Sequence, residues 1–309
     1  MQLKDYAPIN AYDELFYEPH IPHEFAKEFI NELSNFSSED LLNKQKSAEA
    51  LLMQMGVTFT VYGDESATEK IMPFDVIPRI IENSDWENME KGLKQRVEAL
   101  NLFITDIYND QKIIKDNIIP KDVIFGGGFY YDILKGFKPP KGIWIHISGI
   151  DLVRGGDGQF YVLEDNLRCP SGISYVLENR NALKRTFPSI FEKKSVRPVS
   201  NYPSKLFDSL KYLCEGQNDY PSIAVLTPGI YNSAYFEHSF LAQQMGVELV
   251  EGSDLIAEGD YIYTKTTKGL KKIDVIYRRI DDEFLDPMVF NPDSMLGVKG
   301  IMNAYLKGN

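Results

Sequence analysis

Apolar residues in the first third of the chain recur at every third or fourth position, which predicts two long amphipathic helices. The first spans about residues 38–55, with Ser38 suited to its N-terminus and Gly56 to its end. The second spans about residues 85–108. The intervening residues 57–62 alternate between apolar and polar side chains, as a half-buried strand does.

The pattern changes to strands near the middle of the chain. Residues 141–154 are rich in Ile and aromatic side chains, and residues 160–166 form a second strand-like run. The loop between them, RGGDGQ, contains three glycines and an aspartate, which are the residues that short hairpin turns use. We therefore expect a β-hairpin here, followed by a helix over residues 174–187.

The last third of the chain alternates strand and helix. Residues 222–229 predict a buried strand, 233–245 a helix and 247–252 a second strand. A hairpin and a further strand fill residues 261–279. This order is typical of a parallel sheet with helices on its faces.

Two prolines, Pro198 and Pro203, mark a predicted domain boundary. We expect residues 1–197 to hold the helices and the hairpin, and residues 198–309 to form a separate α/β domain. The predicted fold class is therefore α/β with α+β character: a helical N-terminal region, an antiparallel sheet and a βαβ domain.

Composition and charge narrow the class of protein. The 309 residues are 43% apolar and 25% charged, which is ordinary for a globular protein. A formal net charge of -12 argues against nucleic acid as a partner, since phosphate binding needs a basic face. We expect neither a membrane span nor a signal peptide, because no apolar run is suitable. Cys169 and Cys214 form no CxxC pair, so we expect neither a disulfide framework nor a zinc site, and we predict a cytoplasmic protein.

The predicted hairpin carries a candidate metal site. Glu164 and Asn166 are two residues apart on one strand, so their side chains leave the same face. Asp151 lies on the other strand, which the turn brings alongside. Two carboxylates and an amide oxygen are hard ligands that suit Mg²⁺, which also keeps waters and shares phosphate oxygens. Asp165 should point to the opposite face, so it is an internal control for this prediction.

Spacing alone leaves two other interpretations open. The same residues would suit a solvated strand end, with Asp165 and Asn166 opening a turn. A carboxylate pair could instead perform acid–base chemistry on a sugar, which needs a particular separation between the two groups. The sequence does not supply that separation.

Arg168 follows this cluster and is a candidate catalytic residue. Its guanidinium could hold a γ-phosphate or a substrate carboxylate through paired hydrogen bonds. It could equally form a surface ion pair with Asp165 or Glu164. The sequence PSG at residues 170–172 would turn the chain, and backbone N–H groups at the start of the next helix could meet an anion.

The stretch HISGIDLVRGGDGQFYVLEDNLRCPSGISYVLENR resembles the circularly permuted ATP-grasp proteins, relatives of glutathionylspermidine synthase. The similarity continues in TFTVYGDE, IMPFDVIPR, LTPGIYNSAYFEHSFLAQQMGVELVEG and DVIYRRIDDEFLDP, and so covers nearly the whole chain. It implies an ATP-grasp core in which an acid, a second acid and an Asn two residues later hold Mg²⁺ against the phosphates of ATP. Carried over, these residues are Asp151, Glu164 and Asn166.

One position departs from the pattern of the family. In glutathionylspermidine synthase an Arg stands two residues before the first acid, and here that position is Gly149. The corresponding charge must come from elsewhere, with Arg154, Arg168 and His146 as candidates. We take Arg154 and Arg168 as the candidate catalytic residues.

The region from about residue 200 onward resembles the pre-ATP-grasp domain, which flanks the substrate side in this family. Tyr231, Asn232 and Ser233 follow its first strand, where an α/β sheet presents ligand contacts, and are candidate substrate-binding residues. Asn232 or Ser233 could instead cap the next helix. His238, with no second His near it, is interpreted as a packed or surface residue.

Arg278 and Arg279 end another strand and are candidates for the same role. Because neighbouring strand residues face opposite sides, at most one of them would enter the site. Asp281 and Asp282 could instead neutralise them.

Members of this family continue well beyond NAYLKGN, the last residues here, into a lid with lysines and a Gly-rich loop that close on ATP. The chain contains no GxxxxGK[ST] sequence and no evident substitute for that lid. We therefore expect a truncated chain that folds and does not turn over ATP by itself.

The resemblance implies an ATP-dependent carboxylate–amine ligase, in which ATP phosphorylates a carboxylate and an amine attacks the acyl phosphate. The expected cofactors are ATP and Mg²⁺. The expected partners are a small-molecule carboxylate and an amine, with neither nucleic acid nor a membrane, and the sequence does not indicate the oligomeric state. The alternative is a non-catalytic binding or scaffold protein that keeps the ATP-grasp fold.

Overall fold

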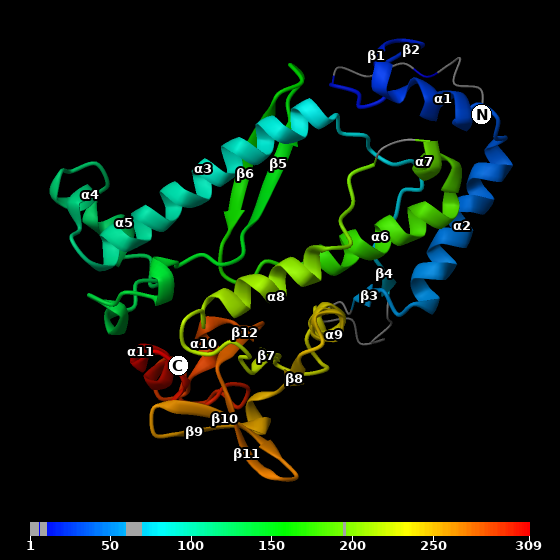
Figure 1. Cartoon of the computed structure of the whole chain (residues 1–309). Helices are drawn as coiled ribbons and strands as arrows, with labels where there is room; N and C mark the ends of the chain where they lie inside the picture. Colours follow the sequence, from blue (N-terminus) through cyan, green and yellow to red (C-terminus); the bar gives the residue numbers. More distant parts are fainter. Residues whose placement is uncertain (1–5, 7–10, 60–69, 194–195) are drawn as a thin grey trace.

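A computed structural model describes residues 6, 11–59, 70–193 and 196–309 of the chain (Figure 1). The N-terminal half is mostly helical, and the strands of the C-terminal third lie together below helix α8 (Tyr202–Tyr212) in the view of Figure 1. The α/β class predicted from the sequence is confirmed.

Both long helices predicted near the N-terminus are confirmed. They are α2 (Ser38–Gln54) and α3 (Asn83–Tyr108). Ser37, one residue before the predicted start, caps α2 through a reciprocal pair of hydrogen bonds with Asp40. The remaining elements of this region are β1 (Phe16–Glu18), β2 (Ile21–Pro22), α1 (Lys27–Leu33), β3 (Thr58–Phe59) and β4 (Lys70–Ile71). The strand predicted over residues 57–62 is thus seen in its first part, and residues 60–62 lie outside the described residues.

The predicted central hairpin is present, with β5 (Gly149–Arg154) antiparallel to β6 (Phe160–Asn166). The first strand is shorter than predicted, because residues 141–148 are not part of it. The backbone N–H groups of Trp144 and Ile145 donate to the side-chain oxygen of Asn101 on α3, at 2.9 and 3.0 Å. This part of the chain is therefore tied to α3 rather than to a neighbouring strand.

Four α-helices flank the hairpin in the described sequence, two on each side. They are α4 (Lys112–Lys115) and α5 (Lys121–Phe125) before it, and α6 (Ile173–Thr186) and α7 (Pro188–Lys193) after it. Helix α6 confirms the helix predicted over residues 174–187 within one residue at each end.

The C-terminal third contains the predicted βαβ unit. Strand β7 (Ile223–Leu226) pairs in parallel with β8 (Glu248–Val250) and with β12 (Val275–Arg278), in the order β12-β7-β8. Helix α9 (Tyr235–Met245) is the crossover between β7 and β8. A separate antiparallel meander and two helices complete the region: β9 (Leu255–Glu258), β10 (Tyr261–Thr266), β11 (Gly269–Ile273), α10 (Asp282–Leu285) and α11 (Ile301–Lys307).

The buried apolar clusters do not stop at residue 198. Phe236 of α9 packs against a cluster that contains Leu52 and Tyr175 from the N-terminal part. In the other direction, Ile147 and Ile173 pack against the cluster beneath β7 and β12. The division at residue 198 stays a prediction, and apolar contacts join the two parts across it. None of the helices in the described ranges is long and apolar enough to cross a membrane.

Candidate functional site

Hairpin β5–β6 brings the three candidate metal ligands onto one face. Asp151 pairs directly with Glu164 across the two strands, and Gly149 pairs with Asn166. The Asn166 side-chain nitrogen donates to the Glu164 carboxylate at 3.1 Å. All three candidate side chains are exposed. Glu164 and Asn166, two residues apart on one strand, therefore face the same side of the hairpin, as predicted.

A β-bulge lies immediately beside this pair. The register shifts after Asp151, so that Leu152 pairs with Val162 and Leu163 is the extra residue. Bulges bend a strand and redirect its side chains, and they are common next to active sites. Here the bulge separates the acidic end of the hairpin from its apolar half.

The pairing of Asp151 with Glu164 places two negative charges directly opposite each other. Like charges in this arrangement destabilise a sheet. Among the described residues, no Lys, Arg or His forms an ion pair with either carboxylate. The pair is thus a place where a bound cation would relieve repulsion.

Asp165 faces the other way, as predicted. Its carboxylate accepts three hydrogen bonds from the guanidinium of Arg96 on α3, at 2.6 to 3.0 Å. These hydrogen bonds hold the pKa of Asp165 below its usual range. The hairpin therefore has one face on α3 and its acidic face away from that helix.

The absence of a side chain at Gly149 leaves the space that Pro170, in the segment after the hairpin, occupies. A Cβ at this position would lie 2.8 Å from the Cβ of Pro170 and 3.6 Å from the Cβ of Asn166. Pro170 is rigid, so the first contact could be relieved only by moving the backbone. A larger side chain does not fit at this position without displacing the segment that follows Asn166.

Arg168 is exposed and lies 5.7 Å from the ring centroid of Phe129. The ion pair with Asp165 or Glu164 that the sequence left open is not formed, since Asp165 pairs with Arg96. Arg168 therefore lies two residues beyond Asn166 in an exposed position, with its guanidinium over the Phe129 ring.

Arg154, the second candidate catalytic residue, is enclosed. It forms ion pairs with Glu14 at 2.9 Å and Asp85 at 2.7 Å, and its side chain is 9% exposed. The ring centroid of Tyr12 lies 3.9 Å from the guanidinium carbon. These contacts tie the far end of the hairpin to the N-terminal region, which favours a structural role for Arg154 over a catalytic one.

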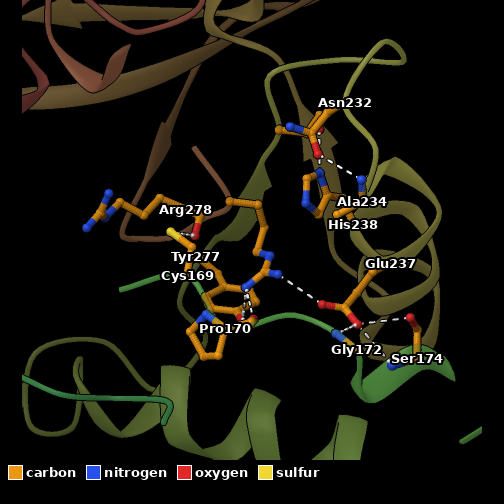
Figure 2. A network of polar contacts seen from close by, with 12 residues as sticks. Cys169, Pro170, Gly172, Ser174, Asn232, Ala234, Glu237, His238, Tyr277 and Arg278 are labelled. Carbon is orange, nitrogen blue, oxygen red and sulfur yellow. Dashed lines mark hydrogen bonds and ion pairs between the residues drawn. The ribbon is translucent and has the colours of Figure 1, made fainter. Parts of the chain in front are cut away.

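The start of α6 is occupied by a carboxylate from the same chain (Figure 2). Glu237 of α9 accepts hydrogen bonds from the backbone N–H of Gly172 at 2.7 Å, and from the backbone N–H and hydroxyl of Ser174 at 3.1 and 2.9 Å. The sequence allowed an anion to meet this helix terminus, and the anion found there is the carboxylate of Glu237. The N–H groups of Gly172 and Ser174 are therefore already occupied by Glu237 and do not face a phosphate.

Arg279 completes this buried group. One of its terminal nitrogens donates to the other oxygen of Glu237 at 2.9 Å, and the second donates to the Pro170 carbonyl at 2.7 Å. The side chains of Arg279 and Glu237 are 2% and 1% exposed. Of the two arginines at the end of β12, Arg279 therefore points inward and forms an ion pair with Glu237. The sequence had suggested Asp281 or Asp282 as the carboxylate that neutralises it.

Arg278 points to the other side of β12, as strand alternation requires. It pairs with Asp282 at 2.5 Å, so one of the predicted neutralising contacts is present. Cys169 lies against the carbonyl groups of Arg278 and Ile280, at 3.9 and 3.6 Å. The chain leaving the hairpin thus runs over the carboxyl end of β12.

The candidate substrate-binding segment after β7 forms a turn. The Asn232 side chain accepts a hydrogen bond from the backbone N–H of Ala234 at 2.9 Å, just before α9 begins (Figure 2). This contact is an Asx turn that precedes the helix. The N-cap residue of α9 is Ala234, so Asn232 does not cap the helix as the sequence had left open. Tyr231 is 88% exposed, and the binding role of Tyr231 and Ser233 stays a prediction.

His238 is buried, as one interpretation of the sequence held. Its ring nitrogen Nδ1 lies 2.8 Å from the Thr227 hydroxyl. Burial, assisted by the nearby Arg279 cation, lowers the pKa of His238 to about 3.

Glu237 is the residue that sequence reasoning missed. It precedes His238 on a predicted helix, and neither its spacing nor its neighbours indicate that it reaches α6. Its importance depends on the packing of α9 against α6, which joins Glu237 to Gly172 across 65 positions of the sequence. No local pattern reveals a contact of that range.

The donor set on the hairpin fits Mg²⁺ and does not suggest a closed protein cage. No group of three or more His, Cys, Asp or Glu side chains in the described part of the chain is placed to hold a metal ion. One oxygen from each of two carboxylates and one amide would leave about half of the octahedral positions of Mg²⁺ to water or phosphate oxygens, and proteins usually bind Mg²⁺ with such shared coordination.

The fold and the hairpin together define an α/β protein with an exposed pair of opposed carboxylates on one face of β5–β6. Comparison with known proteins then supplies the family. The profile of the family described as circularly permuted ATP-grasp type 2 matches residues 78–309. The chain belongs to this family.

The similarity to individual relatives also covers the residues before position 78. An uncharacterized protein of Synechocystis sp. is 53% identical over 308 residues, which are 100% of this chain and 64% of that protein. A putative glutamate–cysteine ligase of Frankia alni is 36% identical, over 92% of this chain and 33% of its own length. The chain thus spans less than two thirds of the length of these relatives.

A solved structure agrees with the fold. A glutathione synthetase-like effector from Globodera pallida, in its apo form, aligns with 85% of this chain and 62% of its own, at a TM-score of 0.52 and 14% identity. At this identity the likeness shows the fold alone.

Proposed function

We propose that this chain provides the magnesium-binding part of an ATP-dependent ligase that joins a small-molecule carboxylate to an amine. The observation that carries the proposal is the cross-strand pair of Asp151 and Glu164, with Asn166 beside it on the same exposed face. The family and the ligase name of the Frankia relative support the class of reaction.

In this proposal the hairpin residues hold Mg²⁺ against the phosphates of ATP. Asp151 and Glu164 would each supply a carboxylate oxygen, and Asn166 its amide oxygen. Mg²⁺ bound there would neutralise charge on the phosphate oxygens and orient them. The acidic pair thereby selects a nucleotide that arrives with its metal over free ATP, whose charge it repels.

The reaction has two steps. A carboxylate oxygen of the substrate attacks the γ-phosphorus of ATP, the bond to the bridging oxygen breaks, and ADP leaves with those electrons. The amine then attacks the carbonyl carbon of the acyl phosphate, phosphate leaves, and the amine loses a proton. The contribution of the protein is to position the reactants and to stabilise negative charge.

Arg168 is the cation best placed to stabilise the transferring group. It follows Asn166 by two residues, and its guanidinium is accessible. A planar guanidinium matches phosphate and carboxylate groups through paired hydrogen bonds. Arg154 does not share this role in the proposal, because Glu14 and Asp85 hold it.

Product detection tests the proposal. The protein is incubated with Mg²⁺, ATP and pooled amino acids and amines, in parallel with the full-length Synechocystis relative, and products are read by mass spectrometry. We expect ADP and a product whose mass equals the sum of two substrates minus water in at least the longer protein. The corresponding Glu164→Gln variant should lack both.

If the longer protein forms no such product and its Glu164→Gln variant binds Mg·ATP unchanged, the ligase proposal is wrong. That result would favour a binding or scaffold role for the fold.

A further inference from the structure

Segment 166–174 connects the candidate metal ligands to α6, and its position depends on two buried side chains from the C-terminal third. Arg279 holds the Pro170 carbonyl at 2.7 Å, and Glu237 holds Gly172 and Ser174. Pro170 in turn lies in the space that a side chain at Gly149 would need, directly opposite Asn166. Figure 2 shows Glu237 with its contacts to Gly172 and Ser174, and Pro170 nearby. From Pro170 the series continues to the end of the hairpin at Gly149.

The energetics argue that this pair does more than fill space. A buried ion pair contributes little stability relative to apolar residues of similar volume, because both charges lose their hydration. Moreover, the Arg279 Nε atom is buried without a hydrogen-bond partner among the described residues. An unpartnered buried donor carries a further cost. Apolar packing would hold α6 and α9 together at a lower cost in free energy, and it would not fix the direction of the 170–174 backbone.

We propose that Glu237 and Arg279 are positioning residues, which set the chain after Asn166 so that Asn166 and Arg168 face the bound Mg·nucleotide. This inference rests on the proposed function for the identity of the ligand. Glu237 reaches the loop through three hydrogen bonds and Arg279 through one, while each also neutralises the other. Neither touches the nucleotide.

The chain offers a matched control in Asp286. This carboxylate is also fully buried and accepts hydrogen bonds from the backbone N–H groups of Gly300 and Met302 at the start of α11. Asp286 therefore accepts hydrogen bonds from the N-terminal N–H groups of a helix, as Glu237 does, and this helix is distant from the hairpin in sequence. Loss of a buried helix-capping carboxylate should destabilise the protein in both cases, and only Glu237 should affect the nucleotide.

The first measurement needs no ligand. Amide hydrogen exchange of residues 166–174 is compared in the wild type, Glu237→Gln and Asp286→Asn, at a temperature where all three are folded. We expect exchange at least about tenfold faster in this segment for Glu237→Gln and unchanged exchange there for Asp286→Asn. Equal protection of the segment in all three proteins would show that Glu237 does not position it.

The second measurement uses Mn·ATP, with binding followed by the electron paramagnetic resonance of Mn²⁺. We expect Glu237→Gln to weaken binding about tenfold or more, as loss of residues that orient metal ligands does. Asp286→Asn should leave affinity within about twofold. The double variant Glu237→Gln/Arg279→Met removes both buried charges, so it should regain thermal stability relative to Glu237→Gln while its affinity stays low.

The outcomes separate the two proposals. Wild-type affinity in a stable double variant, or equal weakening in Asp286→Asn, would overturn the positioning role and leave the metal site intact. If wild type and Glu164→Gln bind Mn·ATP equally, the proposed function is wrong. The hydrogen-exchange result then decides alone whether Glu237 fixes the loop.

Discussion

At the scale of single residues, the direct opposition of Asp151 and Glu164 is the feature with the clearest chemical meaning. Two carboxylates facing each other on an exposed sheet face repel, and among the described residues no cation of the protein is paired with them. The spacing of Glu164 and Asn166 was readable from the sequence. The exact partner of Asp151 depends on the turn and on the bulge at Leu163, which spacing does not give.

Gly149 makes a prediction about packing. Gly149→Ala should destabilise the protein by about 1–3 kcal/mol, because the new Cβ would overlap Pro170. Gly92 lies within α3, and a Cβ added there would meet no atom within 4 Å, so Gly92→Ala should instead stabilise by up to about 1 kcal/mol. Urea unfolding of both variants measures the difference, and equal effects would contradict the contact with Pro170.

His238 makes a prediction about pH. Its pKa is about 3 in the folded protein and near 6.5 when unfolded, so the unfolded state binds more protons between these values. The free energy of unfolding contributed by His238 is therefore complete above pH 6.5 and falls as the pH drops. The slope is at most about 1.4 kcal/mol per pH unit.

Denaturant unfolding from about pH 7 to about pH 5 checks this, above the range where ordinary carboxylates titrate. The slope should be reduced in His238→Gln, which removes the buried imidazole. An identical pH dependence in His238→Gln and wild type would show that the burial of His238 does not matter in this range.

At the scale of elements, the hairpin is held at both ends by arginines that do different things. Arg96 pairs with Asp165 near the acidic end, and Arg154 pairs with Glu14 and Asp85 at the turn end. The helices and strands themselves were predictable, because their periodicity is local. The ion-pair partners of Arg154 and Asp165 lie about 70 to 140 positions away, and charge alone does not identify such partners.

Substitution of Arg154 should therefore lower the stability of the protein, whereas substitution of Arg168 should lower its affinity for Mg·ATP. Arg154→Met leaves Glu14 partly buried without its cation and should destabilise by about 3 kcal/mol. Arg168→Met, at an exposed position, should change stability by less than about 0.5 kcal/mol. Thermal unfolding provides the first comparison, and Mg·ATP affinity the second. A loss of nucleotide affinity in a still-folded Arg154→Met protein, with none in Arg168→Met, would reverse these roles.

At the scale of the whole molecule, residue 198 divides the chain in sequence, but the buried apolar clusters contain residues from both sides of it. Phe236 packs against residues of the N-terminal part, and Glu237 caps α6 from the other side of the boundary. Pro198 and Pro203 predicted where the alternating strands and helices begin. Prolines do not indicate which side chains pack across that boundary. The sequence therefore predicted the βαβ unit and not its attachment.

A fragment of residues 198–309 tests this attachment. Because it would expose Phe236 and leave Glu237 and Arg279 without the 170–174 segment, it should unfold at a lower temperature than the whole chain. Circular dichroism during heating measures both proteins. An identical midpoint in fragment and whole chain would show an independent domain.

The central claim is that Asp151, Glu164 and Asn166 bind Mg²⁺ with ATP. The most direct test is calorimetry of Mg·ATP binding to the wild type, Glu164→Gln and Asp165→Asn, which change neighbouring carboxylates on opposite faces of one strand. We predict that Glu164→Gln lowers the affinity about tenfold or more and that Asp165→Asn stays within about twofold of the wild type. Equal affinity in all three proteins would contradict the claim.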